Sequence, residues 1–199
     1  GEAAYETPSF RRSNAFAFVG AECRAVRETV GLNEIHNFSK FEVTGPGAED
    51  WLNHILANRM PKAGRITLSP MLNPNGKLIG DLTVSHISQD RFQVVGSYAA
   101  QAYHMRWFLS NLPPSGVEIE NISDARIGFQ IAGPRARDLL GRITNQDLSS
   151  ASFPFLGVRE IAVGELRDIV NRISYTGDLG YEIYVDRDDQ VALYHLLKE

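Results

Sequence analysis

The chain has 199 residues, of which 43% are hydrophobic and 22% charged, enough for one sizeable core or two smaller ones. With 20 basic and 24 acidic residues its formal net charge is −4, so no global positive field attracts nucleic acid or an anionic membrane. The single cysteine, Cys23, excludes an internal disulfide and a cysteine-rich metal site. These features favour a small-molecule partner, neither nucleic acid nor a membrane, and a reducing compartment such as the cytoplasm.

The two ends of the chain lack ordinary start and stop signals. The N-terminal segment GEAAYETPSFRR has neither an initiating Met nor an apolar signal core, and no run approaches the ~20 apolar residues of a membrane span. The C-terminal segment DDQVALYHLLKE has a helical pattern but no capping Gly or Asn. We therefore expect a piece of a longer protein.

The first half of the chain alternates between helical and extended patterns. Apolar spacing predicts helices in AECRAVRETVGL, with a stop at Gly31, in TGPGAEDWLNHIL and in YAAQAYHMRWFLSNL. Alternation predicts strands in FSKFEV and in a meander of RITLSPML, KLIGDLTVSHI and RFQVVGS. Because short turns join the meander, its strands are expected to pair antiparallel. The turn Pro-Pro-Ser-Gly at 113–116 is the best candidate for a boundary.

The second half repeats part of the first. The segment VTGPGAEDWLNHI aligns with IAGPRARDLLGRI through a shared Gly-Pro and the same apolar positions of a following helix. RIGFQIAG, VREIAVGEL, RDIVNRISY and YEIYV predict strands, and the C-terminal segment predicts a helix. We expect an α+β fold of two related subdomains, residues 1–115 and 116–199, each with an antiparallel sheet flanked by helices.

Asp81 is the first candidate for chemistry. In the extended segment KLIGDLTVSHI it shares a face with Thr83 and Ser85, near the start of an otherwise apolar strand. Asp is depleted in strands, and a carboxylate there is solvated, paired or in contact with a ligand. One interpretation is an edge-strand acid that faces water. If the face is enclosed, Asp81 can instead hold a cationic group or accept a proton from an amine.

The segment SYTGDLGYEIYV is the second candidate. Gly177 and Gly180 are expected to supply positive φ angles for a tight turn, where Asp178 is a common residue. Tyr175 and Glu182 flank the turn and are expected on adjoining strands, where their side chains can approach each other. An aromatic wall beside a carboxylate suits a flat heterocycle with amino and ring N–H donors. A packed tyrosine beside a solvated acid is the structural alternative.

Other catalytic signatures are absent from the sequence. The five histidines have no metal-ligand spacing, so no metal is expected, and Cys23 has no evident base partner. Neither a Gly-x-Ser-x-Gly nucleophile elbow nor a dinucleotide fingerprint after a strand occurs. From the residues alone the sequence predicts a small α+β protein with one candidate acid and one candidate hairpin.

Five blocks in a fixed order carry a resemblance to a known family. They are SFRRSNAFAFVGAECRAVRETVGL, FSKFEVTGPGAEDWL, MLNPNGKLIGDLTV, IAGPRARDLL and SYTGDLGYEIYV. In these blocks the chain resembles glycine cleavage T protein, or aminomethyltransferase, and most closely the folate-binding C-terminal half of dimethylglycine and sarcosine dehydrogenases. The resemblance covers nearly the whole chain and stops before the family's C-terminal β-barrel.

The resemblance implies a function and three site residues. Asp81 matches the family's essential acid, where tetrahydrofolate meets the one-carbon unit; Tyr175 resembles the folate-site tyrosine, and Glu182 the acid that binds the pterin edge. The implied chain is a tetrahydrofolate-binding fragment of an N-methyl amine dehydrogenase that captures the one-carbon unit as methylene-tetrahydrofolate. The resemblance implies that FAD belongs to a separate N-terminal domain of the full-length protein. It is also compatible with a full-length protein that forms oligomers. The alternatives are a stand-alone aminomethyl or methyl transferase and a non-catalytic folate-binding module.

Overall fold

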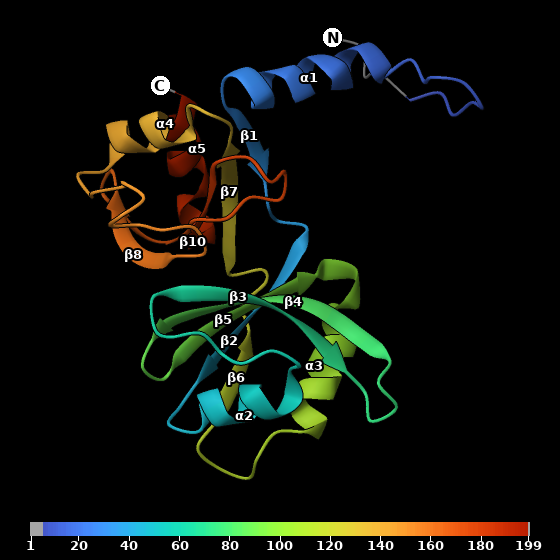
Figure 1. The fold of residues 1–199 in the computed structure, drawn as a ribbon, viewed down its shortest axis with the longest axis vertical. Coiled ribbons are helices and arrows are strands. Elements are labelled where there is room, and N and C mark those ends of the chain that lie inside the picture. The colour runs from blue at the N-terminus through green and yellow to red at the C-terminus, as the bar shows by residue number, and fades with distance from the viewer. Residues whose placement is uncertain (1–5, 199) are drawn as a thin grey trace.

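The computed structural model describes residues 6–198 and contains two five-stranded antiparallel sheets (Figure 1). The first sheet consists, in spatial order, of β3 (Arg65–Leu72), β4 (Leu78–Ser88), β5 (Arg91–Ser97), β2 (Phe38–Thr44) and β6 (Glu118–Asn121). The second consists of β1 (Gly31–Glu34), β7 (Arg126–Ala132), β10 (Gly180–Asp186), β9 (Leu166–Asn171) and β8 (Val158–Val163). The predicted α+β class with two antiparallel sheets is therefore confirmed. Residues 1–5 of the segment GEAAYETPSFRR lie outside the described residues.

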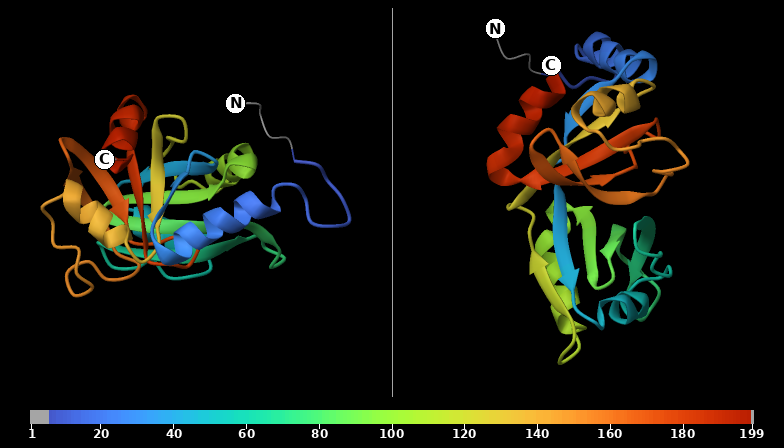
Figure 2. Two further views of the ribbon diagram at one scale, coloured as in Figure 1. Left: turned by 90° about the horizontal axis from the view of Figure 1, so that it is seen from above. Right: turned by 90° about the vertical axis from the view of Figure 1, so that its left-hand side faces the viewer.

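Helices complete each end of the molecule. They are α1 (Phe16–Glu28), α2 (Ala48–Ile55), α3 (Gln101–Ser110), α4 (Ala136–Ile143) and α5 (Gln190–Lys198), with short 3₁₀ turns η1 (Tyr98–Ala100) and η2 (Arg187–Asp189). α2 and α3 lie at the end that contains the first sheet, and α1, α4 and α5 lie at the end that contains the second (Figures 1 and 2). α1 buries none of its residues. Within residues 6–198, no helix is long and apolar enough to cross a membrane.

The repeat detected in the sequence corresponds to a repeated strand, turn and helix. β2 leads into α2 through Gly45-Pro46, and β7 leads into α4 through Gly133-Pro134. Both glycines have positive φ, 115° at Gly45 and 133° at Gly133, a region that strains residues with a Cβ. Each repeat continues with three strands and a helix: β3, β4, β5 and α3 in the first, and β8, β9, β10 and α5 in the second.

Two short edge strands, β1 and β6, connect the halves in a way that the sequence patterns do not predict. β1 pairs with β7 of the second sheet, and Gly31, predicted as a helix stop, is its first residue. β6 follows the turn at 113–116 but pairs with β2 of the first sheet. Four residues are too few to show an alternation, and these strands form because β2 and β7 offer unpaired backbone groups. The subdomain division at residue 115 stays a prediction, since each side of it supplies a strand to the other side's sheet.

An apolar core lies between each sheet and its helices. The first contains Phe41 of β2 and Phe108 of α3. The second contains Ile183 of β10 together with side chains of α4 and α5. Successive strand residues point to opposite faces, so Glu182 and Tyr184 point away from this core. The face of the second sheet that carries them is the face nearer the first sheet.

The inner faces of the two sheets contact each other. A third apolar cluster joins them and includes Ile66 of β3, Val158 of β8 and Tyr184 of β10. Backbone bonds also cross between the sheets: the Ile66 N–H donates to the Leu156 carbonyl at 2.8 Å, and the Val158 N–H to the Gly64 carbonyl at 3.0 Å. The sheets therefore meet where β3 and β8 begin, around an isolated bridge between Arg65 and Gly157.

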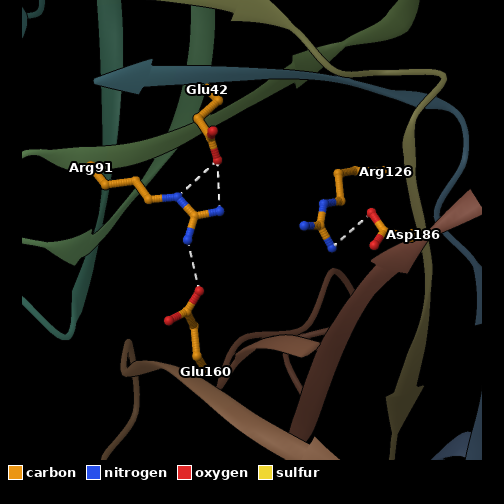
Figure 3. A network of polar contacts seen from close by, with 5 residues as sticks. All are labelled: Glu42, Arg91, Arg126, Glu160 and Asp186. Atoms are coloured by element: carbon orange, nitrogen blue, oxygen red, sulfur yellow. Dashed lines mark hydrogen bonds and ion pairs between the residues drawn. The ribbon is translucent and has the colours of Figure 1, made fainter. Parts of the chain in front are cut away.

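Arg91 of β5 bridges the two sheets by ion pairs (Figure 3). Its Nε and Nη2 lie 2.9 and 2.8 Å from Oε1 of Glu42 on β2, and its Nη1 lies 2.7 Å from Oε1 of Glu160 on β8. The Arg91 side chain is 28% exposed, so solvent weakens part of this attraction. The other pair in the same view, Arg126 with Asp186 at 3.3 Å, lies within the second sheet.

We expect Arg91→Met to lower the free energy of unfolding by about 1–2 kcal/mol at low salt. Methionine keeps an apolar stem but removes the guanidinium that joins the sheets. Urea denaturation of the purified chain measures the loss, which should shrink in about 1 M salt. Arg135→Met, at an exposed position beside α4, is the control; an equal loss in both variants would contradict the bridging role.

The polypeptide before β10 departs from the predicted strand RDIVNRISY. β9 ends at Asn171. Its backbone bonds to the segment before β8 continue for one residue more, since the Arg172 N–H donates to the Gly157 carbonyl at 2.8 Å and the Arg172 carbonyl accepts from the Leu156 N–H at 3.0 Å. Tyr175 consequently lies in the loop between β9 and β10. The prediction that places it on a strand is wrong.

The two glycines of this loop have different roles. Gly177 has a φ of 79°, as predicted for a tight turn. Gly180 does not have positive φ; a Cβ there would lie 2.8 Å from the Ile131 carbonyl oxygen and 2.6 Å from Ser174 Cβ. Glycine at position 180 is therefore required by close packing, which the prediction of a second positive φ angle misses.

Candidate functional site

A cavity of about 780 Å³ lies between the two sheets. Side chains from β4 and β5 of the first sheet and from β7 and β10 of the second line it, together with the segments before β2 and β10. Asp81, Tyr175 and Glu182 all line this cavity, although up to 101 positions separate them in the sequence. Its volume is in the range of roughly 300–1,000 Å³ typical of small-molecule sites.

Glu182 is held at one wall of the cavity by β10. In register it lies between Gln130 of β7 and Asn171 of β9, so these three side chains form a polar row on the inner face of the second sheet. The Tyr184 hydroxyl donates a hydrogen bond of 2.7 Å to Glu182 Oε2. Tyr184 is 1% exposed, which fixes the position of this donor and so of the carboxylate.

The surroundings of Glu182 shift its pKa. Burial raises the pKa, while the hydrogen bond from Tyr184, the Asn171 side chain and the positive charge of Lys40 oppose the rise. The net shift is upward because desolvation of a carboxylate outweighs these interactions. Glu182 therefore carries a partly desolvated charge that a ligand with N–H donors can stabilise.

Lys40 of β2, in the first sheet, is a buried cation that interacts electrostatically with Glu182. It has no exposed surface, and its Nζ donates to the Phe38 carbonyl at 2.8 Å. Burial lowers its pKa from 10.5 to about 8, against the attraction of Asp124 and Glu182. Below pH 8 the ammonium is charged, and its field favours the ionised form of Glu182.

Tyr175 stands at the rim of the cavity. Its side chain is 84% exposed, and its ring centroid lies 6.3 Å from that of Phe38, tilted by 52°. The loop that carries it is closed by a hydrogen bond of 2.5 Å from Ser174 Oγ to the Asp178 carbonyl. An exposed ring on a short loop can cover the face of a planar molecule.

Asp81 lies on β4, an interior strand of the first sheet between β3 and β5. It is opposite Pro70 of β3 in register, and its side chain is exposed but lines the cavity. The ladder between β4 and β5 begins only at Thr83, so at Asp81 the strand is paired on one side alone, and both the interpretation as a solvated acid and the one as a ligand-binding acid stay open. Asp81 is available to a cation or a proton donor that enters the cavity.

Three further residues of the site escape the sequence analysis. Lys40, Gln130 and Tyr184 lie in FSKFEV, RIGFQIAG and YEIYV, which are interpreted only as strands. The available signal was a polar or charged residue at an inward position of an otherwise apolar strand, the same argument that singles out Asp81. The arrangement as a whole offers acceptors at one wall, an aromatic ring at the rim and a second carboxylate on the facing sheet.

The chain belongs to the GCVT N-terminal domain family, which matches residues 2–199. It is 39% identical over 189 residues to human mitochondrial dimethylglycine dehydrogenase and 31% identical over 186 residues to an aminomethyltransferase of Caldanaerobacter subterraneus. It is also 33% identical over 175 residues to sarcosine oxidase subunit alpha of Rhizobium meliloti. The resemblance drawn from the five sequence blocks is therefore confirmed.

The matches cover much more of this chain than of its relatives. They span 94%, 92% and 84% of the chain, but only 22% of the human dehydrogenase, 50% of the aminomethyltransferase and 18% of the sarcosine oxidase subunit. The chain thus corresponds to a domain of these proteins.

Solved structures share the fold at low sequence identity. Aminomethyltransferase T of the glycine cleavage system from Bartonella henselae superposes with a TM-score of 0.79 at 22% identity, over 89% of this chain and 47% of that one. A chain of the heterotetrameric sarcosine oxidase from Corynebacterium sp. U-96 gives 0.67 at 18% identity, over 95% and 93%. These likenesses establish the fold.

Proposed function

We propose that this chain is the tetrahydrofolate-binding domain of an N-methyl amine dehydrogenase related to dimethylglycine dehydrogenase, and that the inter-sheet cavity is its folate site. The observation that carries the proposal is the meeting of Asp81, Tyr175 and Glu182 in one cavity. The sequence resemblance assigns the same three residues to a folate site. The family membership and the 39% identity to human dimethylglycine dehydrogenase support it.

The residues that line the cavity suit a folate. A pterin edge presents an amino group and a ring N–H, which a carboxylate such as Glu182 accepts side by side. Gln130 is 2% exposed, and its Nε2 has no hydrogen-bond partner among the described residues, as expected where a polar ligand group belongs. Phe38, Val95 and Ile173 supply apolar walls.

Each site residue then has a defined task. Tetrahydrofolate, when bound, supplies the nucleophilic nitrogen that takes up the one-carbon unit. Glu182 orients the pterin, and Tyr175 covers one of its faces. The Asp81 carboxylate stabilises the cationic iminium of the oxidised amine and accepts the proton lost by the attacking nitrogen. The same proton can return to the amine nitrogen when its bond to the transferred carbon breaks and the demethylated amine leaves. The walls limit the access of water, which would otherwise hydrolyse the iminium to formaldehyde.

Oxidation of the amine requires a different site. The resemblance assigns it to FAD in a separate N-terminal domain, and we propose no flavin site on this chain because it contains no dinucleotide-binding fingerprint. The domain's own contribution is to hold the two reactants together, which replaces a bimolecular encounter with a local one.

The proposal is tested by calorimetric titration of the chain with folinic acid, a stable reduced folate. We expect binding, and we expect Tyr175→Ala to weaken it about tenfold, because the ring that covers the pterin face is lost. Tyr103→Ala is the matched control, since Tyr103 is also an exposed tyrosine, 46% accessible, and does not line the cavity.

The variant Asp81→Asn distinguishes a role in folate affinity from a role in one-carbon transfer. We expect the variant to bind folinic acid as the unaltered chain does, and to lose one-carbon transfer when placed in the longer protein that carries this domain. If neither the chain nor that longer protein binds folinic acid, the folate function is wrong. If both bind and Asp81→Asn leaves transfer unchanged, the domain is a non-catalytic folate-binding module.

A further inference from the structure

Gln130 occupies an unusual position in the second sheet. It lies on β7, directly opposite Glu182 of β10 on one side and Asn33 of β1 on the other. Its neighbours along the strand, Phe129 and Ile131, point into the apolar core of the second sheet. Gln130 therefore shares the inner face with Glu182, and both line the inter-sheet cavity.

The amide of Gln130 is buried but incompletely paired. The residue is 2% exposed, and over residues 6–198 its Nε2 finds no hydrogen-bond partner. Native proteins rarely leave a buried donor unpaired, because the donor has lost its water and gained nothing in return. A strand that is otherwise apolar would be more stable with an aliphatic residue here. Gln93 is buried and unpaired in the same way, but only Gln130 of the two lines the inter-sheet cavity, where an acceptor of a bound ligand can complete the donor.

Glu182 and Gln130 together present a directional pattern. Directly opposed residues of neighbouring strands have Cβ atoms roughly 4.5–5.5 Å apart, so the two head groups address adjacent atoms of one ligand edge. The carboxylate offers two acceptors and the amide adds a donor. The complementary edge carries two donors followed by an acceptor.

We propose that Gln130 is the residue that recognises the 4-oxo group of the pterin. A pterin presents its 2-amino group, its N3–H and its 4-oxo oxygen in that order along one edge, which matches the two acceptors and the donor. This inference rests on the folate function proposed above and adds the group that selects 4-oxo pterins over their 4-amino analogues. A 4-amino group would place a second donor against the Gln130 Nε2 donor, and two donors that face each other weaken binding. The 4-amino compound also lacks the N3 hydrogen that Glu182 accepts, so Gln130 adds to a selectivity that Glu182 already provides.

The test compares tetrahydrofolate with tetrahydroaminopterin in anaerobic titrations of the chain. In the second compound an amino group replaces the 4-oxo oxygen and N3 carries no hydrogen, so the effect of Gln130 is measured as the change in the ratio of the two affinities between the unaltered chain and the variant. We expect Gln130→Met to weaken tetrahydrofolate about tenfold, because the donor is lost while the side-chain volume is kept. Tetrahydroaminopterin should change by less than about twofold. Gln130→Glu, which replaces the donor with an acceptor, should shift the ratio of affinities towards the 4-amino compound.

Gln93→Met provides the matched control. Gln93 of β5 is also fully buried, and neither of its amide atoms has a partner within the part of the chain that is described. It does not line the cavity. Substitution there should leave the ratio of the two affinities unchanged, so a change of selectivity specific to position 130 cannot come from repacking of the sheets alone.

The titrations distinguish a wrong folate function from a wrong assignment of Gln130. If the unaltered chain and the longer protein bind no tetrahydrofolate, the folate function itself is wrong. If the chain binds tetrahydrofolate and loses it on Glu182→Gln, but Gln130→Met and Gln130→Glu both keep the original ratio of affinities, the assignment of Gln130 is overturned and the folate function stands. Thermal unfolding of each variant shows that the compared chains are folded.

Discussion

Replacing Glu182 by glutamine is expected to weaken folinic acid binding about 100-fold or more. The Glu182 carboxylate is proposed to accept two donors of the pterin edge, and charge-assisted bonds of this kind are roughly twice as strong as neutral ones. Glutamine keeps the shape but presents an N–H where one acceptor was. Calorimetric titration at pH 7.5 or thereabouts measures the loss, and Glu165→Gln, at an exposed turn position, is the control.

Glu182→Gln should also remove the pH dependence of folinic acid affinity. Burial raises the pKa of Glu182, so the group becomes protonated at a higher pH than an ordinary glutamate. A protonated carboxyl cannot accept from both pterin donors, and affinity should therefore fall as the pH falls through this raised pKa. Glu182→Gln should show no such acid limb. An unaltered affinity in the variant, or an acid limb that persists in it, would contradict the role of Glu182.

Asp168→Asn is expected to stabilise the chain by about 4 kcal/mol at pH 8 and to have little effect near pH 4. Asp168 of β9 is 2% exposed, and its Oδ2 has no hydrogen-bond partner in the described part of the chain. Burial raises its pKa from 3.8 to about 7, with the charges of Asp189 and Asp186 adding to the rise and Arg126 opposing it. Asparagine fills the same space without a charge.

The loss of folding stability with rising pH follows from the number of protons that the folded and unfolded chains bind. Between pH 3.8 and about 7 the folded chain holds a proton on Asp168 that the unfolded chain has released, so folding loses stability as the pH rises through this window. Above the window the folded chain contains a desolvated carboxylate. The variant lacks this cost, and the difference between the two unfolding free energies should therefore grow with pH.

Urea denaturation at several pH values measures this difference directly. Asp188→Asn, an exposed position in η2, is the control and should shift stability by less than about 0.5 kcal/mol at any of them. A stabilisation by Asp168→Asn that is equal at pH 4 and pH 8 would show that the carboxyl titrates normally in the folded chain.

The candidate site was only partly predictable from the sequence. Asp81 and Glu182 attract notice because carboxylates are unusual in apolar strands, and the five ordered blocks assign a role to each. Lys40 and Gln130 are also polar residues in strand patterns, but a single strand does not reveal which face is enclosed. Alternation predicts a strand through Tyr175, but the backbone pairing with residues 156 and 157 stops at Arg172, and no local pattern contains this long-range contact.

The sequence by itself determined the α+β class, the repeated strand, turn and helix, and the family, because alternation, helical spacing, Gly-Pro turns and ordered motifs are local properties of the chain. The tertiary structure decided the exchange of the edge strands β1 and β6 between the halves. It also decided the meeting of two polar inner faces in one cavity and the shifted pKa values of Lys40, Asp168 and Glu182. These features depend on which surfaces lose water when the two sheets come together, and desolvation is set by packing between distant segments.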